Sequence, residues 1–353
     1  MKNKLIIVAT HSVNSRGGIS AALEGFEQGF EQLNVEFIRV NSHSDGQGKL
    51  VTWFSAWWQI LLIAISERSN ATFWFHCGPW FSMLRKFSFA LTARCFGCKT
   101  VAHMHSPTLY DYINHSVGRH ILKIFFLPFC SAIALTPWWR SQLVNFGFKK
   151  PISVCQNPVS KQILQAAEVS MGQQSPKTSN NESIVTILSM ARLVTGKGIE
   201  DVIKALAFLP EKFVLKIAGE GSLKMQLIEQ VKQLGLQDRV DFVGWVDSEK
   251  KCTLLEQADI FCLPSRYDSF GVVFIEAMAF NLPVIACDWG PIADVVTPNV
   301  GELVEYGHSE KVAELIVQLI KNKQQYWSEG PAKVIANYSP SICAQTVIDA
   351  LRI

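Results

Sequence analysis

The stretch over residues 258–295 most constrains how this chain can fold. It reads as strand, loop, helix, and then strand, loop and helix again, with short apolar runs at 260–263 and 284–287. Each run is bounded by proline, glycine or polar residues, which is typical of buried parallel strands joined by helices. Ligands of open α/β sheets bind at the carboxyl ends of the strands, where helix N-termini favour anions. The loop 265–271 is therefore the first candidate site.

The same alternation of strands and helices continues through the rest of the chain. Strands are predicted at 4–9, 35–40, 72–77, 100–105, 132–136, 152–155, 184–190, 213–218, 240–243, 260–263, 284–287 and 301–304. Helices are predicted at 19–33, 52–66, 81–96, 118–126, 138–146, 199–208, 248–257, 272–280, 308–322, 332–337 and 341–351. The alternation restarts in the second half, which predicts two similar α/β domains.

A polar tract rich in Gln, Ser, Asn and Lys separates the two halves, and 353 residues are enough for about two domains. We therefore expect an N-terminal domain at 1–160, a linker at 161–183 and a C-terminal domain at 184–337. The last segment, 338–353, is expected to pack back on the N-terminal domain as a helix.

Charge is divided unevenly between the two halves. Residues 1–175 hold 16 Lys and Arg against 8 Asp and Glu, whereas residues 176–353 hold 17 against 22. A basic first half rich in Trp and Phe suggests an anionic surface or acceptor nearby, but basic side chains that simply solvate the domain explain it equally well.

The nine cysteines include one isolated C-x-x-C pair, Cys95 and Cys98, with no second pair to complete a zinc site. Most of the others lie in apolar runs, as small core residues do in reduced, cytosolic proteins. The apolar run at 5–9 is too short for a secretory signal. The expected location is the cytoplasm, with peripheral attachment to the inner face of the plasma membrane as a further possibility.

Residues 50–66 form the most apolar segment, with no charge over 17 positions. Three interpretations compete. The segment is a buried helix of the first domain, an interfacial helix whose Trp53, Trp57 and Trp58 lie at headgroup level, or a membrane-spanning helix. Because the strand and helix pattern continues on both sides, we favour the first two.

Two carboxylates frame the first candidate site. Asp268 and Glu276 stand in a D-x-F-G-x(4)-E pattern, two helical turns apart at ~3.6 residues per turn. This pattern, followed by A-M-A and P-V-I, resembles the carboxylate-pair signature of family 4 retaining glycosyltransferases, although that family usually has Glu where Asp268 stands. The resemblance implies the GT-B fold, two doubly wound Rossmann-like domains facing across a cleft. It also implies that Glu276 accepts from ribose hydroxyls and that Asp268 holds hydroxyls of the transferred sugar.

A second motif places Arg192 and Lys197 between a strand and a helix, with two glycines beside the lysine. Two cations in such a loop can neutralise a diphosphate, although the spacing is not that of a P-loop. The spacing resembles the phosphate-binding pair of the same family. By the same resemblance, Gly219 lies near the nucleotide and Val246 lies near the base.

The N-terminal half carries two further candidates. Gly17 and Gly18 precede the first helix, where glycines let a backbone approach a ligand and the helix dipole is positive. His105 ends a predicted strand, and a lone histidine there is often only structural. The family resemblance favours a contact with the donor sugar. His76 and His11 are weaker candidates.

The resemblance to family 4 implies an enzyme that transfers a hexose-type sugar from a UDP- or GDP-sugar to a saccharide, with retention. Gly18, Phe270, Gly271 and Val272 would offer backbone N–H groups to the leaving pyrophosphate. No D-x-D element is present, so we expect neither a metal nor another cofactor. The expected acceptor is a lipid-linked saccharide of bacterial surface polysaccharide assembly. A GT-B nucleotide-sugar epimerase and a non-catalytic sugar-nucleotide-binding subunit remain open alternatives.

Overall fold

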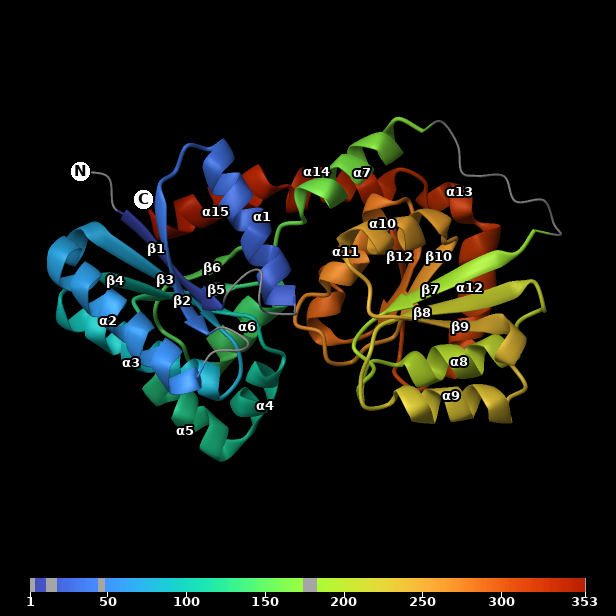
Figure 1. Ribbon diagram of the computed structural model, residues 1–353, viewed down its shortest axis with the longest axis horizontal. Coiled ribbons are helices and arrows are strands. Elements are labelled where there is room, and N and C mark those ends of the chain that lie inside the picture. Colours follow the sequence, from blue (N-terminus) through green and yellow to red (C-terminus); the bar gives the residue numbers. More distant parts are fainter. Residues whose placement is uncertain (1–3, 11–17, 44–47, 174–182, 353) are drawn as a thin grey trace. The chain divides into compact units, whose positions relative to one another are not determined.

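The computed structural model describes residues 4–10, 18–43, 48–173 and 183–352 (Figure 1). The chain divides into two compact units. Unit 1 comprises Met1–Lys161 together with Asn337–Ile353, and unit 2 comprises Gln162–Ala336.

Unit 1 is built on a six-stranded parallel sheet in the order β2-β1-β3-β4-β5-β6. Its strands are β1 (Lys4–Thr10), β2 (Phe37–His43), β3 (Ala71–Cys77), β4 (Lys99–Met104), β5 (Ser131–Ala134) and β6 (Ile152–Val154). Its helices are α1 (Gly18–Gln32), α2 (Lys49–Glu67), α3 (Phe81–Cys95), α4 (Thr108–Asn114), α5 (Ser116–Phe125), α6 (Pro137–Phe146) and α15 (Pro340–Leu351).

The C-terminal helix α15 completes the core of unit 1 by packing on α1. Ala344 and Val347 lie in one buried cluster with Leu5 and Phe26. The two helices approach closely because α1 has a glycine at the contact. A Cβ on Gly29 would come within 2.1 Å of a backbone carbonyl of α15.

Helix α2 is neither fully buried nor fully exposed. Ala56, Ile60 and Ala64 are buried on one side, whereas the opposite side faces solvent. Trp53 and Trp57 donate their indole N–H groups to Ser88 and Thr92 of α3. Two of the three tryptophans expected at headgroup level therefore tie α2 to its neighbour.

Unit 2 holds a second parallel sheet in the order β12-β11-β10-β7-β8-β9. Its strands are β7 (Val185–Met190), β8 (Phe213–Ala218), β9 (Val240–Gly244), β10 (Ile260–Leu263), β11 (Val284–Cys287) and β12 (Gly301–Val304). Its helices are α7 (Lys161–Met171), α8 (Ile199–Ala207), α9 (Lys224–Gln233), α10 (Ser248–Gln257), α11 (Val272–Ala279), α12 (Ser309–Lys321), α13 (Lys323–Tyr326) and α14 (Glu329–Tyr338), the last of which runs across the boundary into unit 1.

Every strand predicted from the sequence is present, whereas α4, α7, α9 and α13 were not predicted. The expected linker at 161–183 is wrong in its first part. Residues 161–171 form helix α7, which belongs to unit 2 from Gln162 onward. Ile163, Ala167 and Ser170 are buried on one side of this helix, which explains why a polar segment is helical there.

Candidate active site

The site in unit 2 lies where the strand order of the sheet reverses, between β7 and β10. The connections from β7 and β10 leave toward opposite sides of the sheet, so their loops open a crevice at the carboxyl ends of the strands. The loop at 191–198 follows β7 and carries Arg192 and Lys197. The loop at 264–271 follows β10 and carries Asp268.

Backbone hydrogen bonds join these loops. Leu193 N–H donates to the Glu220 carbonyl over 2.9 Å, and Arg266 N–H donates to the Gly196 carbonyl over 3.0 Å. The loops after β7, β8 and β10 thus form one continuous edge.

Glycine permits the closest approaches between these loops. Gly198 has φ +75°, and a Cβ there would come within 2.5 Å of the Pro264 carbonyl oxygen. Gly219 has φ +148°, and a Cβ there would come within 1.8 Å of the Ala191 carbonyl oxygen. Any larger residue would force the loops apart.

Lys197, of the predicted phosphate-binding pair, contacts the carboxylate of Asp268 directly. Lys197 Nζ lies 2.7 Å from Asp268 Oδ1, and both side chains are largely buried. Asp268 Oδ2 is buried and has no hydrogen-bond partner among the described residues. The Trp289 indole N–H donates to the Asp268 carbonyl over 3.2 Å, which fixes the loop. Arg192 lies exposed at the start of its loop.

The second carboxylate, Glu276, projects from α11 and is buried. Its Oε1 accepts from Lys251 Nζ of helix α10 in a salt bridge. Sequence reasoning missed Lys251, because no local spacing links residues 25 positions apart on different helices. A buried carboxylate depends on such a partner, since an unpaired charge is costly away from water.

The part of the chain that holds these loops matches a known protein family. Residues 171–337 fit the family model described as "Glycosyl transferases group 1". The chain carries a group 1 glycosyltransferase domain. This domain covers nearly all of unit 2.

Curated relatives of the glycosyltransferase domain resemble this chain over only part of their own lengths. N-acetyl-alpha-D-glucosaminyl L-malate synthase of Bacillus anthracis is 29% identical over 184 residues, which are 51% of this chain and 47% of that protein. Phosphatidyl-myo-inositol mannosyltransferase of Mycobacterium leprae is 33% identical over 160 residues, 43% of this chain and 42% of that protein. The chain thus spans less than half the length of these two relatives.

Solved structures match the whole chain in fold. Anabaena HepE in complex with UDP has a TM-score of 0.72 at 17% identity, with 100% of both chains covered. Sucrose-phosphate synthase of Thermosynechococcus elongatus has a TM-score of 0.75 at 17% identity, covering 99% of this chain and 98% of that one. The two six-stranded parallel sheets and these likenesses establish the GT-B fold predicted from the sequence.

The other residues predicted for the donor site of the glycosyltransferase domain lie near the same edge of its sheet. Gly219 directly follows β8, and Val246 lies between β9 and α10. Gly271 caps α11 with φ +78°, between buried Phe270 and half-buried Val272. The first N–H groups of a helix have no partner within it, so α11 presents donors at this edge.

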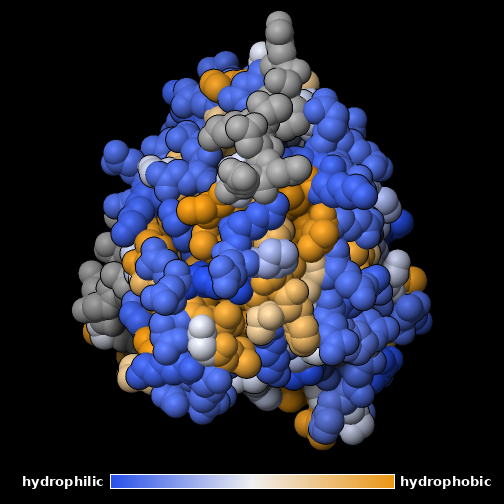
Figure 2. All heavy atoms as spheres, turned by 90° about the vertical axis from the view of Figure 1, so that its right-hand side faces the viewer, coloured by the Kyte–Doolittle hydropathy of each residue, from blue (hydrophilic) through white to orange (hydrophobic). Residues whose placement is uncertain are grey.

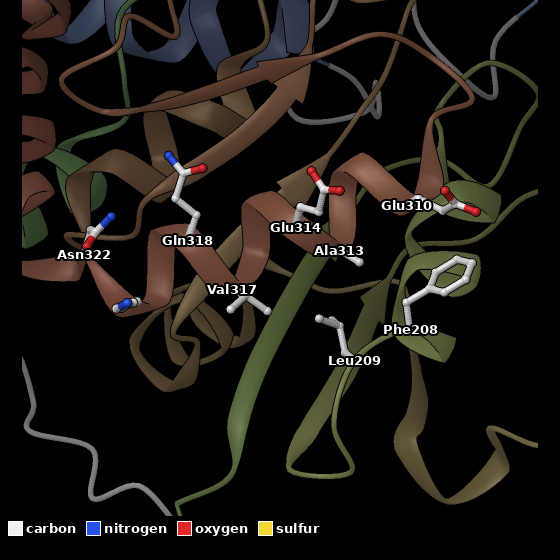
Figure 3. Close-up of a pocket in the computed structure, with 9 residues that line it drawn as sticks. Phe208, Leu209, Glu310, Ala313, Glu314, Val317, Gln318 and Asn322 are labelled. Atoms are coloured by element: carbon white, nitrogen blue, oxygen red, sulfur yellow. The ribbon is translucent and has the colours of Figure 1, made fainter.

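A separate groove of the glycosyltransferase domain lies elsewhere. It encloses about 730 Å³, and Figure 3 shows Phe208 and Leu209 facing Ala313 and Val317 of α12. Figure 2 shows apolar side chains gathered on one face of this domain. Because α8 begins at the carboxyl end of β7, residues 208–209 at its far end lie at the opposite edge of the sheet. The groove therefore does not belong to the loop site.

The unit 1 candidates are only partly described. Gly17 and His11 lie outside the described residues, and Gly18 is the first residue of α1. His105 follows β4, as predicted, but its ring is buried. Its Nε2 lies 2.9 Å from Nδ1 of His76, which sits on the neighbouring strand β3.

A third histidine, His103, joins this pair. His103 lies opposite His76 in the β3–β4 register, and one ring nitrogen from each of the three lies within 4.8 Å of the others. Burial and then neighbouring positive charge lower the pKa of His105 to about 3. Burial also lowers the pKa values of His76 and His103 well below the usual range, so all three rings are neutral at pH 7.

In the described part of the chain, these three histidines form the group that could hold a metal ion. Neutral imidazoles suit a divalent metal. The expectation that the protein needs no metal stays a prediction.

The Lys251–Glu276 salt bridge predicts a large effect of one substitution. Lys251→Met leaves Glu276 as a buried charge without its partner, which costs about 3–5 kcal/mol of unfolding free energy for a buried pair. Urea denaturation measures the loss. Lys250→Met, at an exposed neighbour on the same helix, serves as the control. The double variant Lys251→Met/Glu276→Gln should recover most of the loss, and a Lys251→Met protein as stable as the control would contradict the role.

The buried Lys86 is expected to make the unfolding free energy depend on pH. Burial lowers the pKa of this lysine to about 7, and its Nζ donates to Ser42 Oγ. Between that pKa and about 10.4 in the unfolded chain, the unfolded state binds more protons at this lysine, so the contribution of Lys86 to the unfolding free energy rises with pH. Buried thiols whose pKa values are raised contribute with the opposite sign, so the effect of Lys86 is the difference in slope between the wild type and a variant that lacks it. This difference approaches about 1.4 kcal/mol per pH unit.

Lys86→Met removes this rise, which urea denaturation at about pH 7 and about pH 9 would reveal. Lys99→Met, at an exposed lysine of β4, keeps the wild-type slope. Equal slopes in the wild type and Lys86→Met would show that Lys86 does not titrate in this range.

Proposed function

We propose that the protein is a retaining glycosyltransferase that moves a hexose-type sugar from a nucleotide diphosphate sugar to a saccharide acceptor. The observation that carries the proposal is the pairing of cations and carboxylates at the crevice of a group 1 glycosyltransferase domain. The lipid-linked acceptor and the role in bacterial surface polysaccharide assembly belong to the same proposal. Lipopolysaccharide core and amylovoran glycosyltransferases among the relatives support them.

The transfer needs stabilisation of the pyrophosphate as it leaves. Arg192 and Lys197 supply positive charge, and the N-terminus of α11 supplies backbone donors. Lys197 is already bonded to Asp268, but an ammonium has three N–H donors. It can therefore keep Asp268 and still donate to a phosphate oxygen.

The two carboxylates hold hydroxyl groups. Glu276, oriented by its salt bridge with Lys251, accepts from the ribose hydroxyls. Asp268 Oδ2, which is buried and has no hydrogen-bond partner among the described residues, accepts from a hydroxyl of the transferred sugar. His105 contacts the sugar, and we assign no protein nucleophile.

The donor is a UDP- or GDP-sugar. HepE binds UDP and UDP-glucose in its solved structures, and one relative from Corynebacterium glutamicum is named a GDP-mannose-dependent mannosyltransferase. Neither name decides the base for this chain. No cofactor or metal enters the proposal, and an acceptor linked to lipid places the enzyme at the inner face of the plasma membrane.

A thermal-shift screen of UDP-, GDP- and ADP-sugars identifies the donor, because a ligand at 100 times its Kd stabilises the fold by about 2.7 kcal/mol. With that donor, Lys197→Ala should lower the transfer rate by about 10²–10³, the usual effect of removing one charge-stabilising donor. Glu276→Ala should also lower the rate, because the ribose hydroxyls lose their acceptor. The rate is measured by release of the nucleoside diphosphate.

Lys204→Ala provides the matched control, since Lys204 is an exposed lysine of α8. Wild-type rates in both Lys197→Ala and Glu276→Ala would refute the site. A stabilised protein that converts its donor to an epimer without acceptor would establish the epimerase, and binding without turnover of any acceptor would establish a non-catalytic subunit.

A further inference from the structure

An exposed apolar surface covers three neighbouring helices of unit 1. Along α2, the exposed side chains recur at helical spacing on the side away from the sheet: Leu50, Val51, Phe54, Trp58, Leu62 and Ile65. They span 16 residues, a rise of about 22 Å at ~1.5 Å per residue. Single exposed apolar residues are ordinary, but a continuous stripe of this length marks an interaction surface.

Exposed apolar side chains also occur on the two helices that follow α2 in this layer. Phe81 and Leu84 of α3 and Ile124 of α5 are also exposed, Phe81 by 80% of its surface. Helix α3 packs between α2 and α5, as Figure 1 shows. We call the exposed apolar side chains of α2, α3 and α5 the apolar helix face.

The apolar helix face is held rigid. The two indole hydrogen bonds from α2 to α3 lock these helices together, and Ala56, Ile60 and Ala64 anchor α2 to the unit. Residues 50–70 form the one described segment with the length and composition of a membrane span, yet one side of it packs inside unit 1. A helix fixed in this way lies along an interface.

The charge on these helices indicates which kind of surface the apolar helix face would bind. By sequence, residues 49–67, 81–95 and 116–125 contain six Lys and Arg but one acidic residue, Glu67, although Lys86 is buried and so does not reach the surface. Glu67 is neutralised by Lys4 at 2.6 Å, whereas Arg94 and Lys123 are exposed. Apolar side chains flanked by cations match a bilayer with anionic headgroups.

We propose that the apolar helix face docks unit 1 on an anionic lipid bilayer, with α2 lying in the headgroup region and Trp58 at the acyl boundary. This surface is separate from the donor-binding loops of unit 2, so the proposal goes beyond the transferase activity. Insertion requires no change in the fold, because the side chains are already presented.

Co-sedimentation of the full chain with vesicles tests the docking. Wild-type protein should bind vesicles of equal parts phosphatidylglycerol and phosphatidylcholine at low salt, and bind phosphatidylcholine alone less. Phe54→Gln/Trp58→Gln/Leu62→Gln should lower the affinity at least about tenfold, because each change removes apolar surface buried in the bilayer. Val144→Gln/Val169→Gln/Met225→Gln, at exposed apolar positions outside this face, should bind as wild type.

Both triple variants should keep the wild-type thermal shift with nucleotide, which shows that they are folded and separates the docking from the donor site.

Equal vesicle binding by the two triple variants, or none by wild type, would overturn the proposal. A wild-type dimer in light scattering that only the α2 variant dissolves, without vesicle binding, would assign the face to a second copy of the chain. Vesicle binding without sugar transfer would refute the enzyme proposal alone.

Discussion

The loop site of unit 2 depends on how closely its backbones approach one another. Leu193 bonds to the carbonyl of Glu220, and a Cβ on Gly219 would meet the carbonyl of Ala191 at 1.8 Å. These contacts exist because parallel strands deliver all their carboxyl ends to one edge, and glycine lets the loops meet there. The positions of the charged side chains follow from that backbone frame, so the frame matters more to the site than any one side chain.

Much of the fold could be predicted from the sequence because each strand is a short apolar run bounded by turn residues. The helices that were missed lack a matching signal. Helix α9 buries only Leu227 and Val231 among its described side chains, and α7 lies in a tract rich in Gln and Ser. Where few side chains are buried, apolar periodicity is weak, and tertiary contacts decide that the segment is helical.

The places of the candidate residues at the ends of strands were predictable, but their pairings were not. Loop spacing located Arg192, Lys197, Asp268 and Glu276, whereas the partner of Glu276 comes from another helix and leaves no local pattern. The histidines show the same limit of prediction from local spacing. His105 is where strand patterning places it, but its contact with His76 arises from the register of β3 against β4. Register and crossing helices create neighbours that spacing along one segment does not reveal.

Because helix α15 belongs to unit 1, the two units can fold at different stages of synthesis. Unit 2 is one continuous segment, so it can fold as soon as it has been synthesised. Unit 1 is interrupted by unit 2, and its core includes Ala344, Val347 and Leu351 beside Leu5. Strand β1 therefore completes its packing only after α15 has been synthesised. Until then the incomplete core of unit 1 leaves apolar surface uncovered, so chaperone binding would be concentrated on the N-terminal part of the nascent chain.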